Sequence, residues 1–138
     1  MFSSVNRTRQ TLPRLPFQLL AEEIIGTKYD LSLVFIGDKR ARQLNAIYRA
    51  KTYVPNVLSF PLSKSGGEIF INLRQAKKEC GKFDRTLREH TAFLFIHGLL
   101  HLKGYAHGSR MEEKERNYMR HFVFNDQKHR HRTWYWYR

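Results

Sequence analysis

Three histidines in one short segment constrain the fold of this chain more than any other feature. They occupy positions 97, 101 and 107, in the spacing HxxxHxxxxxH. Residues four apart on an α-helix project from the same face, so His97 and His101 can direct their imidazoles at one point. Gly104 stands where helices often end in a left-handed conformation that glycine adopts at little cost. The chain can then turn back, and we expect His107 to supply a third nitrogen.

Three histidine ligands would leave one position of a tetrahedral zinc ion to water. Catalytic zinc sites keep such an open position, whereas structural zinc is normally enclosed by four protein ligands. The alternative is a core helix with hydrogen-bonded histidines, because Leu99 and Leu100 are apolar. Packing explains one histidine better than three, since every ring nitrogen in an apolar region needs a partner. We therefore expect one Zn²⁺ per chain, held by His97, His101, His107 and a water.

Three stretches of the chain together carry a family resemblance. They are HGLLHLKGYAHG at 97–108, LNAIYR at 44–49 followed by VLSFP at 57–61, and GEIFI at 67–71. These resemble the motifs HGxLHLxGYDH, LNxxYR...TDVLSFP and GDIxI of the YbeY family, which are single-strand-specific endoribonucleases of ribosomal RNA maturation. The similarity runs in order from about Tyr29 to about Phe124.

The chain departs from these motifs at three places. Ala106 stands where the family has an aspartate, Pro55 and Asn56 replace a threonine and an aspartate, and Glu68 replaces the aspartate of GDI. The first change removes a carboxylate that could orient a ligand histidine.

The resemblance also implies a role for Arg49. In the family, the arginine at this motif position lies in the active-site cleft, where a guanidinium can grip a phosphate and offset charge in the transition state. Without the motif, Arg49 would be a surface residue of a basic protein. We predict that Arg49 is catalytic and that Arg49, Lys51, Lys103 and Arg110 contact RNA.

The charge of the chain favours a polyanionic partner. Lys and Arg number 25 against 12 Asp and Glu, which gives a net charge of +13. Such charge raises the local concentration of a polyanion, and each neutralised phosphate releases counterions. A merely soluble basic protein is the alternative. We expect single-stranded RNA as the partner, and the resemblance implies ribosomal RNA or the ribosome.

Cysteine content and hydropathy indicate the compartment. Cys80 is the only cysteine, so no intrachain disulfide can form, and we expect no disulfide-linked partner. No apolar run approaches the roughly 20 residues that span a bilayer, and the N-terminus lacks the apolar core of a secretory signal. Residues 1–16 faintly resemble a transit peptide, but we interpret them as the lead-in to a first helix. We expect a cytoplasmic protein without a membrane partner.

Hydrophobic periodicity predicts both helices and strands. The expected helices span 14–27, 38–48, 72–80, 84–103 and 109–124. The expected strands span 29–36, 57–62 and 67–72. The last two strands should pair as an antiparallel hairpin. We predict an α+β fold with one domain, residues 1–126: a small mixed sheet of about four strands, packed with helices, in which a central helix carries HxxxH. The sheet order is implied by the resemblance.

Capping residues and core positions refine these elements. We expect Asp38 and Asn72 to cap the helices that follow them, and Ser109 with Glu112 to form a capping box. The helix over 38–48 should send Leu44 and Ile47 to the core. The inner face of the last helix should consist of Met111, Tyr118, Met119, Phe122 and Val123.

The tail, residues 127–138, mixes cations with Trp134-Tyr135-Trp136-Tyr137. Aromatic side chains among cations suit contact with single-stranded RNA, because bases stack on rings while phosphates meet cations. A final strand or a disordered end are the alternatives.

These observations predict a zinc-dependent endoribonuclease that acts in ribosomal RNA processing. Gly98 stands where the HExxH motif of zinc peptidases has its glutamate base, which argues against a peptidase. Zinc can lower the pKa of bound water to around 7, which suits hydrolysis of a phosphodiester. The alternatives are a non-catalytic ribosome- or RNA-binding protein with a structural zinc site and, more remotely, a metallohydrolase of small substrates.

Overall fold

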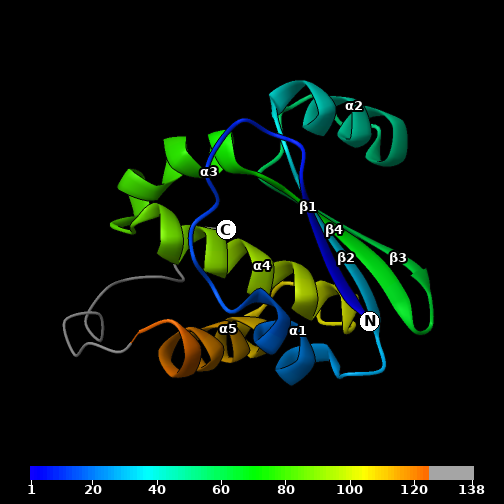
Figure 1. The fold of residues 1–138 in the computed structure, drawn as a ribbon, viewed down its shortest axis with the longest axis vertical. Helices are drawn as coiled ribbons and strands as arrows, with labels where there is room; N and C mark the ends of the chain where they lie inside the picture. The colour runs from blue at the N-terminus through cyan, green and yellow to red at the C-terminus, as the bar shows by residue number, and fades with distance from the viewer. Residues whose placement is uncertain (125–138) are drawn as a thin grey trace.

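Four strands form one mixed sheet in a computed structural model that describes residues 1–124 (Figure 1). The strand order is β1-β2-β4-β3. β1 (Phe2–Asn6), β2 (Asp30–Ile36) and β4 (Gly66–Asn72) are parallel, and β3 (Val57–Ser63) pairs antiparallel with β4. The α+β architecture and the hairpin are therefore confirmed.

β1 was not predicted, because its segment was interpreted as the lead-in to a helix. Its burial pattern shows why: only Phe2 is partly buried, and Ser3 to Asn6 are exposed. The strand forms by pairing with β2, a contact distant in sequence that leaves no periodic signal. The Phe2 ring then packs 6.5 Å from the ring of Phe95.

Helices cover both faces of the sheet. α4 (Leu87–Leu102) packs on β3 and β4, and α1 (Phe17–Ile25) and α5 (Ser109–Phe122) pack on α4 (Figure 1). α3 (Leu73–Cys80) contacts α4, and α2 (Asp38–Arg49) lies on β4. No helix within residues 1–124 has the length and apolarity needed to cross a membrane.

β2 separates two hydrophobic clusters, as its nearly continuous apolar sequence predicts. Leu33 and Phe35 belong to the large core beneath α1 and α4, whereas Val34 and Ile36 belong to a smaller cluster with Leu44 of α2. The sheet is thus buried on both faces along β2, and it forms a rigid support for α4.

α4 is the central helix. It begins at a capping box in which the Thr86 hydroxyl accepts from the Glu89 backbone N–H and the Glu89 carboxylate accepts from the Thr86 backbone N–H. Gly98 lets the helix approach the sheet closely, because a Cβ there would lie 2.8 Å from Ser59 Oγ and 3.2 Å from Ile69 Cδ1. The glycine that argued against a peptidase therefore has a packing role.

Two of the three predicted caps are wrong. Gly37 is the N-cap of α2, and the Asp38 carboxylate instead accepts from Asn72 Nδ2 at 2.8 Å. Ser109 is already the first residue of α5, so the capping box with Glu112 does not form. Asn72 does cap α3, with its side chain accepting from the backbone N–H three residues later.

The prediction that Ile47 is a core residue is also wrong, since 68% of it is exposed. The buried residues of α2 are Ala41, Leu44 and Asn45. At about 100° per residue these share one arc of about 100°, and Ile47 lies about 60° outside it. Asn45 was missed because it is polar. Its Nδ2 donates to the backbone oxygen of Tyr53 at 3.0 Å, whereas its buried Oδ1 has no hydrogen-bond partner within residues 1–124.

Candidate metal centre

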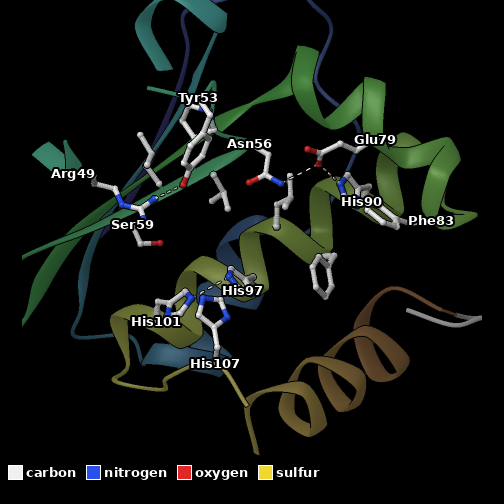
Figure 2. A pocket seen from close by; sticks show the side chains of 15 residues that line it. Arg49, Tyr53, Asn56, Ser59, Glu79, Phe83, His90, His97, His101 and His107 are labelled. Carbon is white, nitrogen blue, oxygen red and sulfur yellow. Dashed lines mark hydrogen bonds and ion pairs between the residues drawn. The ribbon is translucent and has the colours of Figure 1, made fainter. Parts of the chain in front are cut away.

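The three histidines converge at the end of α4 (Figure 2). The Nε2 atoms of His97 and His101 are 3.0 Å apart, and the ring centroid of His107 lies 5.1 Å and 4.6 Å from theirs. One ligand atom from each ring lies within 4.8 Å of the other two. The three side chains could therefore hold a metal ion together.

A glycine turn brings the third histidine to the first two. Gly104 has φ +108°, and its N–H donates to the His101 oxygen at 3.0 Å, while the Tyr105 N–H donates to the Leu100 oxygen at 3.0 Å. This pair of bonds is the Schellman motif that ends many helices. Because the motif reverses the chain at once, His107 returns beside α4.

Hydrogen bonds fix the rings of the two helical histidines. His101 Nδ1 lies 3.1 Å from the backbone oxygen of Tyr105, which can only accept, so this nitrogen carries a proton. His97 Nδ1 lies 2.7 Å from Oε2 of Glu115 and donates to that carboxylate. If neither Nε2 carries a proton, the two rings present lone pairs 3.0 Å apart. Two such acceptors repel each other unless a cation lies near both, so the arrangement suits a metal ion.

Glu115 supplies the kind of carboxylate that Ala106 cannot. It is fully buried on the inner face of α5, between Met111 and Met119 at four-residue spacing. Hydrogen bonding to a carboxylate orients a ligand imidazole and makes it more basic. Glu115 was not among the predicted site residues, although an acid on a predicted apolar face was a usable signal.

Substituting Glu115 with glutamine should weaken metal binding while leaving the fold intact. Glutamine still accepts from His97 Nδ1 but carries no charge, so the zinc dissociation constant should rise by about 10- to 100-fold. Competition with a chromophoric chelator measures this change. Glu113→Gln, at an exposed position on the same helix, is the matched control. Equal zinc affinity in wild type and Glu115→Gln would contradict this role.

The histidines open into a pocket of about 830 Å³. Arg49 and Ser59 also line it, so Arg49 and the three histidines face the same pocket. Arg49 Nη1 donates to the hydroxyl oxygen of Tyr53 at 3.4 Å, and within residues 1–124 it has no carboxylate partner. Ser59 donates to the Gly98 oxygen at 3.2 Å, so its hydroxyl helps to seat α4.

The other predicted RNA contacts lie elsewhere on the surface. Lys51, Lys103 and Arg110 are exposed and are not among the residues that line the pocket. They remain predictions of more distant contacts along an RNA chain. The predicted contacts of the tail, residues 127–138, fall outside the described residues.

The opposite end of the pocket holds a buried histidine that sequence analysis did not single out. Arg85 Nη1 donates to His90 Nδ1 at 2.9 Å, so the ring proton is on Nε2. This Nε2 donates to Glu79 Oε1 at 3.0 Å (Figure 2). The rings of Phe83 and Phe93 flank this imidazole. His90 was passed over because a single histidine on an apolar helix is most simply a core residue.

The protonation states at this end follow from burial and hydrogen bonding. Burial lowers the pKa of His90, and the nearby Arg85 charge lowers it further, so the ring is neutral at pH 7. Burial alone would raise the pKa of Glu79, but hydrogen bonds from His90, Asn56 and Gln75 outweigh it and leave that pKa below its usual value. Glu79 is therefore an anion at the pocket wall.

Comparison with known proteins places these features in a family. The family model described as Endoribonuclease YbeY matches residues 4–126. Endoribonuclease YbeY of Mycoplasma mycoides is 38% identical over 96 residues, covering 62% of this chain and 58% of that protein. Endoribonuclease YbeY of Mesoplasma florum is 36% identical over 116 residues, covering 70% of this chain and 69% of that protein. Endoribonuclease YbeY of Geobacillus kaustophilus is 31% identical over 120 residues, covering 76% of this chain and 77% of that protein. The match thus spans less than two thirds of the first of these relatives.

A solved structure supports the fold. The solution structure of TM1509 from Thermotoga maritima superposes with a TM-score of 0.61 at 24% identity and covers 86% of each chain. At this identity, the likeness concerns the arrangement of the sheet and helices only.

Proposed function

Because the chain belongs to the YbeY family of endoribonucleases, we propose that it is a zinc-dependent enzyme that cleaves single-stranded RNA during ribosomal RNA processing. The observation that carries the proposal is the pair of Nε2 atoms on α4, oriented by Glu115 and by a backbone oxygen, with His107 beside them. Histidine nitrogens are common zinc ligands, and three of them leave a position open for catalysis.

Each side chain of the site has a distinct proposed role. His97, His101 and His107 would hold the ion. Zinc in such a site supplies an activated water at neutral pH and polarises a phosphate oxygen. Arg49 would bind the scissile phosphate with its planar guanidinium and offset the charge that develops there.

Two features favour RNA over a peptide or a small molecule. Gly98 leaves the helix without the glutamate base of zinc peptidases, and the close contact with Ser59 leaves no room for one. A net charge of +13 favours capture of a polyanion. The alternative function, RNA binding with a purely structural zinc, is less favoured because His107 is exposed and the histidines line an open pocket rather than a closed core.

Metal removal tests the proposal. The full chain, purified without a nickel column, should contain about one equivalent of zinc and should cleave a labelled single-stranded RNA faster than the same sequence in a duplex. Chelation should stop cleavage, and added zinc should restore it, because the bound ion would activate a water and polarise a phosphate oxygen. Undiminished cleavage by protein shown to be metal-free would refute zinc dependence. RNA binding without any cleavage by the zinc-loaded protein would support the structural alternative.

A further inference from the structure

The pocket extends well beyond the three histidines. Its volume of about 830 Å³ is in the range that encloses a whole organic ligand. His90 lies seven residues before His97 on α4, so two helical turns, or about 10 Å, separate the two ends. A histidine nitrogen that binds zinc lies only about 2 Å from the ion, which is far less than the separation of the two ends. The far end therefore contacts a different part of any substrate held at the histidines.

Glu79 is fixed at this far end as a hydrogen-bond acceptor. Within residues 1–124, three N–H groups donate to its carboxylate: His90 Nε2 at 3.0 Å, Asn56 Nδ2 at 2.9 Å and Gln75 Nε2 at 3.1 Å. A carboxylate offers about four lone-pair positions, so one is left for a ligand. The side chain is 18% exposed and lines the pocket, which gives a ligand access to it.

We propose that this end of the pocket binds a nucleobase of the RNA and that Glu79 and Asn56 together select guanine. The inference rests on the proposed function, because it takes single-stranded RNA as the ligand. It adds a base-recognition site next to the site of cleavage.

The charges at the two ends of the pocket determine which part of the RNA each end binds. Arg49 lies at the histidine end, whereas Glu79 is an anion at the far end (Figure 2). Arg85, whose guanidinium donates to His90 Nδ1, is buried and does not line the pocket. A carboxylate repels a phosphate but accepts hydrogen bonds from base N–H groups. The far end therefore suits a base, and the histidine end suits a phosphate.

Guanine fits the acceptors best. Asn56 must direct its Nδ2 at Glu79, since a carboxylate only accepts, and its Oδ1 then faces away from Glu79 on the pocket side (Figure 2). The site thus offers two acceptors, one on each side of the Asn56 Nδ2: the Glu79 carboxylate and the Asn56 oxygen. Guanine presents two adjacent donors, N1–H and the N2 amine, on its Watson–Crick edge, whereas adenine, cytosine and uracil each present one donor group there.

An aromatic side chain at the same end provides a stacking surface. The Phe83 ring is half-buried, lines the pocket and lies 5.6 Å from the His90 ring. Bases of single-stranded RNA stack on such rings with little sequence preference. Stacking on Phe83 therefore contributes affinity for any base, and Glu79 with Asn56 contributes the preference.

Binding in the presence of a chelator tests the inference without cleavage. The probes are unstructured, labelled oligouridines that carry one central guanosine, inosine, adenosine or cytidine, titrated with the full chain. Guanosine should bind about 10- to 100-fold more tightly than adenosine or cytidine, and inosine, which lacks the N2 amine, should be intermediate. Glu79→Gln should lower the guanosine affinity to that of adenosine. Glu23→Gln, at an exposed position on α1, should retain the preference.

The outcomes separate this inference from the proposed function. Equal affinity for all probes, including no binding at all, overturns the guanine site, as does a preference that survives Glu79→Gln. Cleavage with no guanine preference leaves the proposed function standing alone. A guanine preference that depends on Glu79, in a protein that never cleaves RNA, refutes the nuclease and supports the base site.

A second variant keeps the test decisive if Glu79→Gln unfolds, which thermal unfolding would detect. Phe83→Leu removes the stacking surface but leaves the hydrogen bonds of Glu79 in place. It should weaken binding of all four probes by a similar factor while retaining the guanosine preference. Unchanged affinities for every probe would show that no base stacks at this end and would overturn the inference.

Discussion

Replacing His101 with alanine is expected to abolish zinc binding and RNA cleavage together. His101 lies at the centre of the three histidines, with its ring centroid 4.5 Å from that of His97 and 4.6 Å from that of His107. Loss of a residue that merely orients a ligand costs about 10- to 100-fold in metal affinity, so loss of the ligand itself should exceed 100-fold. Zinc titration and a cleavage assay on single-stranded RNA measure the two effects.

The fold should survive this change, because His101 is only half-buried and alanine favours a helix. His121→Ala is the matched control, since His121 is exposed on α5 and is not among the three converging histidines. It should keep both zinc binding and cleavage. Cleavage by His101→Ala at the wild-type rate would show that the activity does not depend on this site or comes from a contaminating nuclease.

Replacing Gly98 with leucine is expected to destabilise the protein severely. A single added carbon would already lie 2.8 Å from Ser59 Oγ and 3.2 Å from Ile69 Cδ1, and leucine adds three more. Overpacking of a core typically costs about 1–3 kcal/mol and occasionally more. We expect at least about 3 kcal/mol here, because α4 must move away from the sheet. That is a large share of the 5–15 kcal/mol typical of a folded domain.

Urea unfolding of the metal-free protein measures this loss. Gly81→Leu is the control, because an added carbon at Gly81 meets nothing within 4 Å. The two variants share the same chemical change, so the difference between them isolates the contact with the sheet. Equal stability of both variants would contradict the proposed role of Gly98 in seating α4.

The spacing of the histidines predicted their convergence because one helix and one turn determine it. A four-residue interval on a helix and a glycine at its end are local features, and the Schellman motif at Gly104 realises them. Glu115 and Glu79 were not predicted, because each comes from another helix and reaches its histidine only after tertiary packing. Their sequence positions carry no sign of which imidazole they will contact.

Local patterns also account for the other successes and failures. Within residues 1–124, three strands and the five α-helices have periodic or β-rich sequences, whereas β1 depends on pairing with β2. Asp38 and Ser109 are residue types that suit caps, but glycines immediately before them take the cap positions. Ile47 was wrongly predicted to be a core residue because it is apolar. It is exposed, because it lies outside the arc of α2 that faces the sheet.

The third histidine belongs to the connector between α4 and α5 and not to a helix. His107 is exposed, next to Gly108 with φ +155°, whereas His97 and His101 are anchored on a helix held on several sides. Exposed connectors open far more readily than buried helices. An ion coordinated by all three side chains would therefore exchange with solution through brief detachment of the connector, at a rate independent of global unfolding.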